Sequence, residues 1–397
     1  MIQGYLRQDG RKGIRNHVAV VYLVECAHHV AREIQAPYRD RGVHVIGFPG
    51  CYPNDYSLRM LKALCTHPNV GAVLMVSLGC EGFNRHELYE AVRESGRPVR
   101  LIGIQAAGGT RRSVEEGRAW VADALETLKA TPRAPMSASE LVVGTICGGS
   151  DATSGLTANP AMGRAFDYLV EEGGAAIFEE TGELIGLESL MAERARTPAL
   201  GAAIGACMEK TARYYATLGH ASFAPGNADG GLTTIEEKSL GAYAKSGHSA
   251  IAGLLKPGDV PPAGGLYLLD VIPDGEVRFG FPNINDNAEI AELIACGSHV
   301  ILFSTGRGSV VGSALAPVIK VCANPATFRR MGDDMDVDAG RILEGRATVD
   351  EVGREIHEFV KRVAAGEPTR SEALGHQEFI LTYKSFAPLG PECLPGR

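Results

Sequence analysis

The sequence predicts an α/β protein with two Rossmann-like domains, each built on a doubly wound, mostly parallel sheet. Short continuous runs of Val, Ile and Leu alternate along the chain with amphipathic stretches of helical period. Continuous rather than alternating apolar runs indicate strands that are buried on both faces. Glycine-rich polar segments follow several of these runs, as expected for loops that approach a ligand closely. The 397 residues suffice for two or three domains of about 150 residues.

The first domain is predicted to span residues 1–132. Apolar runs predict strands at 17–24, 43–47, 72–78 and 99–104, and amphipathic stretches predict helices near 27–36, 55–64, 85–94 and 114–128. Because strands and helices alternate, we expect parallel strands joined by right-handed crossovers. The charged, proline-containing stretch 129–139 interrupts this pattern and is predicted to be a linker.

The second domain is predicted to span residues 133–397. Strands are expected at 141–146, 175–178, 266–269, 300–304 and 318–321. Helices are expected at 160–172, 183–195, 202–218, 235–244, 288–295 and 350–365. Three glycine-rich loops belong to this domain: CGGSD (147–151), GGLTT (230–234) and STGRG (304–308).

The composition excludes several classes of protein. Lys and Arg number 39 against 47 Asp and Glu, a net charge of −8, so the basic footprint of a nucleic-acid-binding protein is missing. No apolar run approaches the ~18 residues of a membrane span, and no signal peptide is recognisable. Nine cysteines without tight spacing favour reduced thiols in a cytoplasmic protein. Neither a Walker loop nor GxGxxG is present, so no nucleotide is expected.

Cysteines follow four of the predicted strands. They are Cys26, Cys51, Cys80 and Cys147, and the carboxylates Glu81 and Asp151 lie close to two of them. Because ligands of open α/β sheets bind at the carboxyl ends of the strands, we expect these residues at one common edge. We predict a metal site there with ligands drawn from Cys51, Cys80, Glu81, Cys147 and Asp151. The alternative is that each cysteine is a small buried apolar residue; the missing CxxC spacing argues against a closed structural zinc site.

Two polar segments are candidates for substrate binding and catalysis. The loop from Cys147 to Pro160 ends at a predicted helix start, where backbone N–H groups suit a carboxylate, so Ser150 and Asn159 are predicted to contact substrate. The alternative is that this segment only connects two elements of the fold. The acidic run 179–183 enters a helix, so its carboxylates are either favoured by the helix dipole or bind a cation. We assign Glu180 a catalytic role.

The segment 226–239 is the most informative one. Thr234 is predicted to be a helix N-cap, and Glu237 three residues later completes a capping box. Lys238 is predicted to be a catalytic base with a pKa lowered by desolvation, with Glu237 as a second catalytic residue and Thr233 and Thr234 as substrate contacts. The alternative for Lys238 is an exposed helical lysine.

An acidic enzyme that binds an acid needs local positive charge. Arg307, between two glycines after a predicted strand, suits a bidentate grip on a carboxylate. Arg11 and Arg15 offer a second such pair near the N-terminus.

Six motifs occur in order along the chain. They are GY…DGR…GIRN (4–16), LGCE (78–81), CGGSD…SG…ANP (147–160), GN…GGLTTI…EKSLG (226–241), STGRG (304–308) and GDDMD…AG (332–340). Together they resemble the altronate/galactarate dehydratase family. The resemblance implies a metal-dependent lyase, with Fe²⁺ as the usual metal and Mn²⁺ or Mg²⁺ as alternatives, that removes water from a sugar acid to give a 2-oxo acid.

The resemblance leaves other functions open. The same family includes a sulfolactate sulfo-lyase large subunit, which eliminates sulfite from a hydroxy acid. The chain departs from the family at Phe48–Cys51, which lacks the His expected shortly before the cysteine, and in segment 281–291, so a non-catalytic acid-binding subunit is a third possibility. An iron–sulfur dehydratase is a fourth, because three separated cysteines can hold a cluster.

The resemblance also bears on partners. The small antifreeze-like domain that precedes the first motif in longer family members is not recognisable here, so we expect a separate small subunit to supply it. The alternative is that segment 281–291 acts as the lid of a self-sufficient chain. We expect a homo-oligomer.

Overall fold

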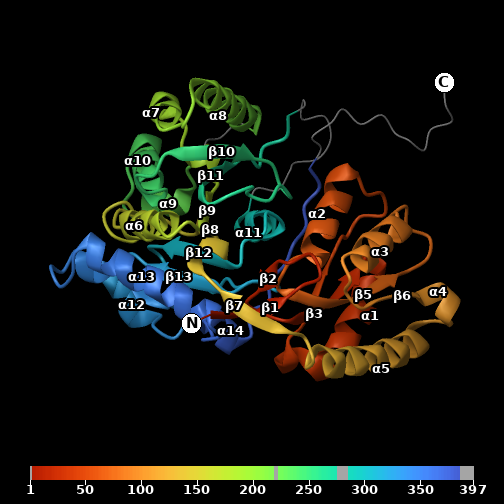
Figure 1. Ribbon diagram of the computed structural model, residues 1–397. Helices are drawn as coiled ribbons and strands as arrows, with labels where there is room; N and C mark the ends of the chain where they lie inside the picture. The colour runs from red at the N-terminus through yellow and green to blue at the C-terminus, as the bar shows by residue number, and fades with distance from the viewer. Residues whose placement is uncertain (1, 219–221, 275–284, 385–397) are drawn as a thin grey trace, which may run out of the picture.

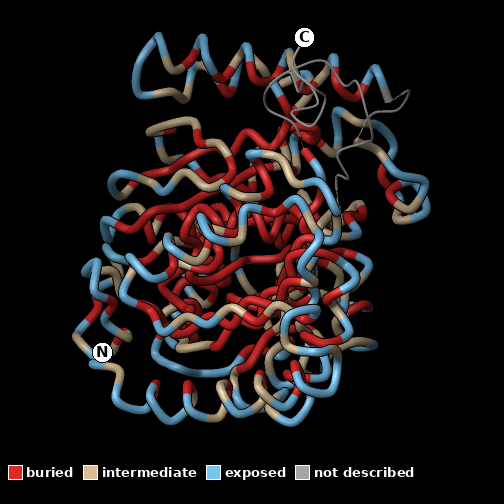
Figure 2. Tube along the Cα trace, turned by 90° about the vertical axis from the view of Figure 1, so that its right-hand side faces the viewer, coloured by how far each residue is buried: buried red, intermediate tan, exposed pale blue. Residues whose placement is uncertain are grey.

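The computed structural model describes residues 2–218, 222–274 and 285–384, and it confirms the predicted α/β class (Figure 1). Two sheets, one of four and one of seven strands, contain only parallel neighbours. Helices cover both faces of each sheet, as in doubly wound folds. In Figure 2 the buried residues fill the middle of the molecule and the exposed ones line the outer helices.

The four-stranded sheet has the order β4-β3-β5-β6. Its strands are β3 (His17–Tyr22), β4 (Val43–Gly47), β5 (Val70–Ser77) and β6 (Val99–Gly103). Its helices are α1 (Glu25–Gln35), the 3₁₀-helix η1 (Ala36–Arg41), α2 (Asp55–Cys65), α3 (Arg85–Glu94), α4 (Ile104–Ala107) and α5 (Thr110–Leu128). The strand order reverses between β3 and β5, which is therefore the switch point of this sheet.

The seven-stranded sheet has the order β10-β11-β9-β8-β12-β13-β14. Its strands are β8 (Val142–Cys147), β9 (Ala175–Phe178), β10 (Ile251–Leu255), β11 (Gly265–Leu269), β12 (Val300–Thr305), β13 (Val318–Cys322) and β14 (Val337–Asp338). The chain builds outward from β8 through β9 and then returns to β12 on the other side. The switch point of this sheet therefore lies between β8 and β12.

The helices of the second half of the chain vary in length. They are η2 (Ala138–Glu140), α6 (Ala158–Glu171), η3 (Thr181–Glu183), α7 (Glu188–Glu193), α8 (Pro198–Leu218), α9 (Pro225–Asp229), α10 (Ile235–Lys245), α11 (Asp286–Ala295), α12 (Pro325–Arg330), η4 (Gly340–Ile342), α13 (Val349–Ala364) and α14 (Arg370–Leu374). The helix expected at 183–195 is interrupted: η3 and α7 are separated by a turn in which Gly186 has a φ of 92°. No helix in the described ranges has the length and apolar character to cross a membrane.

The segment expected to be a linker forms a strand. β7 (Arg133–Met136) pairs antiparallel with β1 (Ile2–Leu6), with Tyr5 opposite Arg133, and β2 (Lys12–Gly13) pairs with the other side of β1. The prediction of a plain linker is therefore wrong for these four residues. The division of the chain after residue 132 remains a prediction.

Polar side chains of the first half of the chain contact polar side chains of the second half. Lys384 and Glu292 form a fully buried ion pair at 2.7 Å, and Tyr56 of α2 donates to the same carboxylate at 2.6 Å. A buried pair of this kind fixes the position of the groups that it joins, because a single unpaired charge would be costly. The C-terminal segment is thereby fastened between α2 and α11.

Candidate active site

The loops that follow β8, β9 and β12 meet at the switch point of the seven-stranded sheet. Gly148 donates its N–H to the carbonyl of Ser304 at 2.9 Å. The N–H groups of Gly306 and Arg307 both donate to the carbonyl of Gly149, at 3.0 and 2.9 Å. These bonds place the CGGSD and STGRG loops side by side at the strand ends, where a doubly wound sheet binds its ligands.

A buried group of one thiol and two carboxylates lies at this edge. Cys147 ends β8, and its Sγ lies 3.3 and 3.4 Å from the carboxylate oxygens of Glu183 in η3. Glu180, which follows β9, accepts the backbone N–H of Cys147 at 3.1 Å. The three side chains each offer one ligand atom, and these atoms all lie within 4.8 Å of one another.

Two lysines of α10 face this group. Lys238 lies 2.7 Å from Glu183, and Lys245 forms an ion pair with Glu180 and lies 3.8 Å from Glu183. The spacing of seven residues is two helical turns, so both ammonium groups project from the same face of α10. The site thus pairs two buried cations with two buried anions.

The prediction of a lowered pKa for Lys238 is wrong. Burial by itself lowers the pKa of this lysine, but the neighbouring Glu183, Cys147 and Glu180 outweigh it, and the pKa is raised. The pKa of Lys245 is also raised, because Cys147, Glu180 and Glu183 outweigh its complete burial. Both lysines are therefore cations at neutral pH in the structure.

The pKa values of the acidic members of the group shift in different directions. Burial, together with Glu180 and Glu183, raises the pKa of Cys147 well above its usual value. Burial and Glu183 raise the pKa of Glu180, whereas Lys238 and Lys245 overcome burial and lower the pKa of Glu183. Glu183 is therefore the most strongly ionised acid of the group.

Further acids surround the site. Glu179 is 2% exposed, and neither of its carboxylate oxygens has a hydrogen-bond partner among the described residues. Burial followed by Glu289 and Glu180 raises the pKa of Glu179 well above its usual value. Burial and Glu183 raise the pKa of Asp286 to about 6. These raised pKa values mean that burial favours the protonated forms of Glu179 and Asp286, and a cation bound at this edge would compete with those protons.

Glu180 adopts a strained backbone conformation. Its φ of 60° and ψ of 41° lie in the left-handed region, and it is the one non-glycine residue with positive φ in the described ranges. Such conformations cost about 1–3 kcal/mol and gather at functional sites, where the surrounding contacts hold them. The bonds to Cys147 and Lys245 provide that hold on the Glu180 carboxylate.

The donor set fits a divalent transition-metal ion. A thiolate combined with carboxylates suits ions of intermediate softness such as Fe²⁺ rather than Ca²⁺, which prefers oxygen ligands alone. The unpartnered Glu179 carboxylate nearby shows that the residues of this edge do not satisfy one another fully. Cys147, Glu180 and Glu183 could therefore bind a metal ion.

Several predicted residues lie beside this group with other partners. The Ser150 hydroxyl is 3.3 Å from the Cys147 sulfur. Asp151 accepts hydrogen bonds from Thr153 at 2.9 Å and Asn324 at 2.9 Å, so its carboxylate is used within the loop. Asn159 donates to the carbonyl of Gly241, while its Oδ1 lacks a partner among the described residues. The structure thus places Asp151 outside the group that could hold a metal.

The start of α10 is built as a cap. Thr234 accepts the N–H of Glu237 at 3.2 Å, which confirms the predicted N-cap. The Glu237 carboxylate accepts from the backbone N–H of Thr233 at 2.7 Å, one residue earlier than the predicted capping box requires. Thr233, Thr234 and Glu237 are exposed, so their side chains serve the helix end while Lys238 points inward to Glu183.

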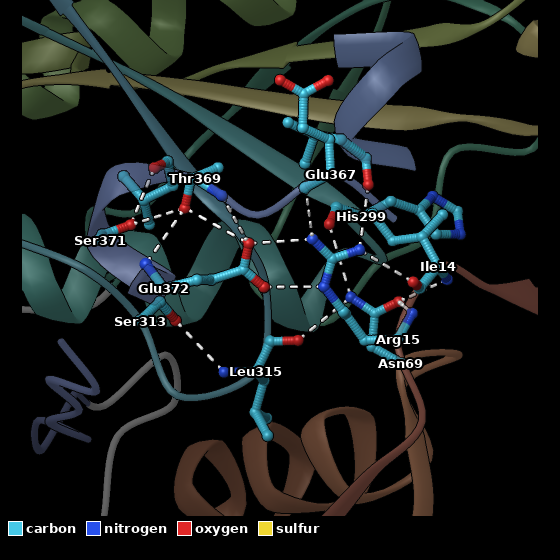
Figure 3. A network of polar contacts seen from close by, with 12 residues as sticks. Ile14, Arg15, Asn69, His299, Ser313, Leu315, Glu367, Thr369, Ser371 and Glu372 are labelled. Atoms are coloured by element: carbon cyan, nitrogen blue, oxygen red, sulfur yellow. Dashed lines mark hydrogen bonds and ion pairs between the residues drawn. The ribbon is translucent and has the colours of Figure 1, made fainter. Parts of the chain in front are cut away.

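The three predicted arginines lie at opposite edges of the molecule. Arg307 contacts the carbonyl of Gly226 at the strand ends and stays 44% exposed. Arg15 precedes β3 and pairs with Glu372 at 2.7 Å, in the polar network of Figure 3. Arg11 pairs with Asp9 at 2.6 Å and donates to Thr66, which follows α2. Arg11 and Arg15 therefore lie at the amino ends of the strands, away from Cys147.

The expectation of one common cysteine edge is wrong. Cys51, Cys80 and Glu81 follow strands of the four-stranded sheet, whereas Cys147 belongs to the seven-stranded one. Cys51 and Cys80 are exposed and Cys147 is buried. The sequence shows that a cysteine follows each strand, but it does not show which strands share a sheet.

The sequence does not single out Lys245 as a member of the site, and it gives no individual role to Glu183. Lys245 closes α10 and carries no signal apart from its spacing of seven from Lys238. The sequence indicates Glu183 only as part of the acidic run 179–183. Residues 281–284 of the expected lid 281–291 lie outside the described residues, and the rest of it forms the start of α11.

Comparisons with known proteins agree over nearly the whole chain. The family model described as D-galactarate/Altronate dehydratase, C-terminal, matches residues 138–386. The model described as D-galactarate dehydratase/Altronate hydrolase, second domain, matches residues 4–129. The subunit beta of (2R)-sulfolactate sulfo-lyase from Chromohalobacter salexigens is 33% identical over 96% of both chains.

Two relatives that are longer than this chain also match it. Altronate dehydratase of Bacillus subtilis is 30% identical over 96% of this chain and 77% of its own length. Galactarate dehydratase (L-threo-forming) of Escherichia coli is 34% identical over 78% of this chain and 59% of its own length.

Proposed function

The chain belongs to the D-galactarate/altronate dehydratase family, and from this membership we propose that it is a metal-dependent lyase that removes water from a sugar acid or a related hydroxy acid to give a 2-oxo acid. Its named relatives are dehydratases and a sulfo-lyase, so they are lyases. The observation that carries the proposal is the buried group Cys147–Glu180–Glu183, faced by two lysines at a switch point.

Dehydration of a 2,3-dihydroxy acid requires two proton transfers. The proton on C2 passes to a base, the C3–O bond breaks, and the hydroxide leaves as water with a proton from an acid. The resulting enol then tautomerises to the 2-oxo acid. A divalent ion, when bound, stabilises the negative charge that develops beside the carboxylate.

We assign the roles from the contacts in the site. Of the three residues that could bind an ion, Cys147 and Glu183 would hold it, since their donor atoms lie 3.3–3.4 Å apart, and Glu180 would be kept for proton transfer. Lys238, a cation, would give the proton to the leaving hydroxide. Glu180, held in its strained conformation by Cys147 and Lys245, would accept the C2 proton. Arg307 would bind the substrate carboxylate.

The test separates metal binding from proton transfer. The anaerobic protein is loaded with Fe²⁺ or Mn²⁺ and screened with aldonic, aldaric and short hydroxy acids for 2-oxo acid formation. Cys147→Ser and Glu183→Gln should lose both metal and activity. Lys238→Met and Glu180→Gln should lower kcat by about 10²–10⁴-fold while retaining metal. Full activity after exhaustive chelation would overturn metal dependence.

Sulfite elimination is the second candidate. The relative that matches over 96% of both chains is named a sulfo-lyase subunit, whereas the Bacillus subtilis altronate dehydratase is covered over 77% of its length. Sulfonated hydroxy acids therefore belong in the same screen, with sulfite release as the readout. Sulfite without any dehydration product would favour this candidate.

We also propose a second, small subunit, because the sulfo-lyase relative is named as one subunit of its enzyme. Such a subunit would cover the exposed edge around Arg307 and exclude water. Purification of the chain alone and together with a small protein encoded beside it would decide this. Equal turnover in both preparations, without co-elution, would refute the two-subunit proposal.

A further inference from the structure

The short segment of residues 222–230, which contains α9, contacts two side chains of the proposed site. The carbonyl of Ser222 accepts a hydrogen bond from Nζ of Lys238 at 2.7 Å. The carbonyl of Gly226 accepts one from the guanidinium of Arg307. The position of this one segment therefore affects both the proposed acid and the proposed binder of the substrate carboxylate.

Asn227 fastens the 222–230 segment to the CGGSD loop. The residue is 5% exposed, and its Oδ1 accepts the N–H of Ala224 at 2.8 Å, which closes the first turn of α9. Its Nδ2 donates to the carbonyl of Ser150 at 3.2 Å. The hydroxyl of Ser150 lies 3.3 Å from the sulfur of Cys147, so this bond connects α9 to the centre of the site.

Asn227 also completes the surroundings of the Lys238 ammonium group, which has three N–H donors. Nζ of Lys238 lies 2.7 Å from the carboxylate of Glu183. The other two acceptors are the carbonyl of Ser222 at 2.7 Å and Oδ1 of Asn227 at 3.4 Å. Two of the three acceptors thus belong to the 222–230 segment, and the direction in which Lys238 presents its protons depends on where that segment lies.

Close packing holds the far end of the segment against the same loop. The N–H of Ala152 donates to the carbonyl of Gly230 at 3.1 Å. A Cβ on Gly230 would lie 2.9 Å from the Cβ of Asp151 and 3.2 Å from the carbonyl oxygen of Ser150. A side chain at Gly230 would therefore push the segment away from the CGGSD loop.

We propose that Asn227 is a positioning residue that holds Lys238 where it can protonate the leaving hydroxide. The proposal rests on the proposed function, in which Lys238 is the acid and Glu180 accepts the C2 proton. When Lys238 is displaced, the C3–O bond breaks more slowly, and the proton on Glu180 has time to exchange with solvent. A proton from water then returns to C2, and the substrate is recovered with all its other bonds intact.

The first experiment measures this competition in deuterated water. A 2,3-dihydroxy acid that the parent chain dehydrates is followed by NMR, both for deuterium at C2 of the recovered acid and for the 2-oxo acid. In Asn227→Ala the ratio of C2 exchange to dehydration should rise about tenfold or more, because small displacements of a catalytic group are costly. Gly230→Ala displaces the same segment by another route and should raise the ratio as well. An unchanged ratio in both variants would overturn the proposal.

Asn69→Ala is the matched control. Asn69 is a fully buried asparagine that donates to the carbonyl of Leu315 at 3.1 Å, in the network of Figure 3. Its replacement should lower the unfolding temperature and leave the ratio of exchange to dehydration unchanged. A merely structural role of Asn227 would give that same result.

The second experiment does not depend on activity. The drop in unfolding temperature caused by Asn227→Ala is measured in the parent chain and in Lys238→Met. Because the effects of residues in contact are not additive, this drop should be smaller in Lys238→Met, whereas the drop caused by Asn69→Ala should be equal in both chains. Equal drops for Asn227→Ala would overturn the proposal. A parent chain that dehydrates no acid would refute the proposed function, and this experiment would still decide whether Asn227 holds Lys238.

Discussion

At the residue scale, Arg15 and Arg307 show how one type of side chain serves two purposes. Arg15 is 13% exposed, pairs with Glu372 and donates to the carbonyl of Val363, so its guanidinium is used up within the protein (Figure 3). Arg307 is 44% exposed and contacts one carbonyl and, at 3.8 Å, Asp229. Only Arg307 retains donors for a ligand at the strand ends.

Replacement of Arg307 by Lys retains the charge but removes the planar fork that grips a carboxylate with two parallel bonds. We expect kcat/KM to fall about tenfold or more on the true substrate, with no change in the unfolding temperature. Arg15→Lys is the matched control and should show the reverse, a lower unfolding temperature with unchanged kcat/KM. Steady-state kinetics and thermal unfolding of both variants measure this; wild-type kcat/KM in Arg307→Lys would remove the residue from the site.

Glu237 is expected to act at a helix end rather than in catalysis. Its exposed carboxylate accepts from Thr233, and burial contributes little, so its pKa is lowered chiefly by these hydrogen bonds. Glu237→Gln should leave kcat within about threefold of the parent and cost at most about 1 kcal/mol of stability. A loss of kcat of a hundredfold without loss of fold would restore the catalytic role that the sequence suggests.

At the element scale, the position of α10 depends on its close approach to α6. A Cβ added to Gly163 of α6 would lie 2.1 Å from the carbonyl oxygen of Ala244 and 2.7 Å from the backbone nitrogen of Gly247. These atoms are backbone and cannot rotate away. The absence of a side chain at Gly163 therefore sets the distance at which α10 presents Lys245 to Glu180.

Gly163→Ala should therefore push α10 away from the site. We expect a loss of about 1–3 kcal/mol of stability from overpacking and a fall in kcat/KM of about tenfold or more from misplaced lysines. Gly205→Ala in α8 is the matched control, because a Cβ there meets nothing within 4 Å. It should raise stability by about 0.5–1 kcal/mol and leave kcat/KM unchanged. Thermal unfolding and kinetics of the two variants give the comparison.

Elements with strong local signals were predictable, and those made by distant partners were not. The strands of both parallel sheets stand out because they are buried on both faces and therefore continuously apolar. β7 is the short segment Arg-Ala-Pro-Met, which contains Pro135 and no continuous apolar run. It is a strand only because β1, far away in the sequence, pairs with it. For the same reason Lys245 reads as an ordinary surface cation until the fold brings Glu180 to it.

At the scale of the whole molecule, the two sheets keep their chemistry apart. The seven-stranded sheet gathers buried acids and lysines around Cys147, while the four-stranded sheet presents exposed thiols. The sequence predicts chemistry at the ends of strands, and at the seven-stranded sheet the structure places a thiol and two carboxylates close together there. It cannot assign strands to sheets, since that assignment depends on pairing between strands that are far apart in the sequence, such as β8 with β12.

His299 makes the junction of the two halves sensitive to acid. Its Nδ1 accepts the N–H of Val142 at 3.1 Å and its Nε2 lies 2.9 Å from the carbonyl of Lys12, so the ring fits the junction as the neutral form. Burial, the largest cause, lowers the pKa of His299 to about 4. The unfolded chain, with a histidine pKa of about 6.5, therefore takes up the proton first as the pH falls.

The contribution of His299 to stability is consequently complete above about pH 6.5 and is lost as the pH falls toward 4. The loss amounts to up to about 3 kcal/mol for a shift of this size. Urea unfolding across this pH range should show a smaller pH dependence in His299→Gln than in the parent chain. His86→Gln, at an exposed position of α3, is the control and should leave the pH dependence unchanged. Equal slopes in parent and His299→Gln would contradict this account.

The pairing of β1 with β7 has a consequence for how the chain could be assembled from modules. Because Tyr5 and Arg133 are opposite one another, the polypeptide leaves and re-enters the rest of the molecule at neighbouring points. Residues 7–132, with the whole four-stranded sheet, are thus an excursion between two adjacent strands. Such an excursion can be exchanged or lengthened without rerouting the seven-stranded sheet, since close entry and exit points are what domain insertion requires.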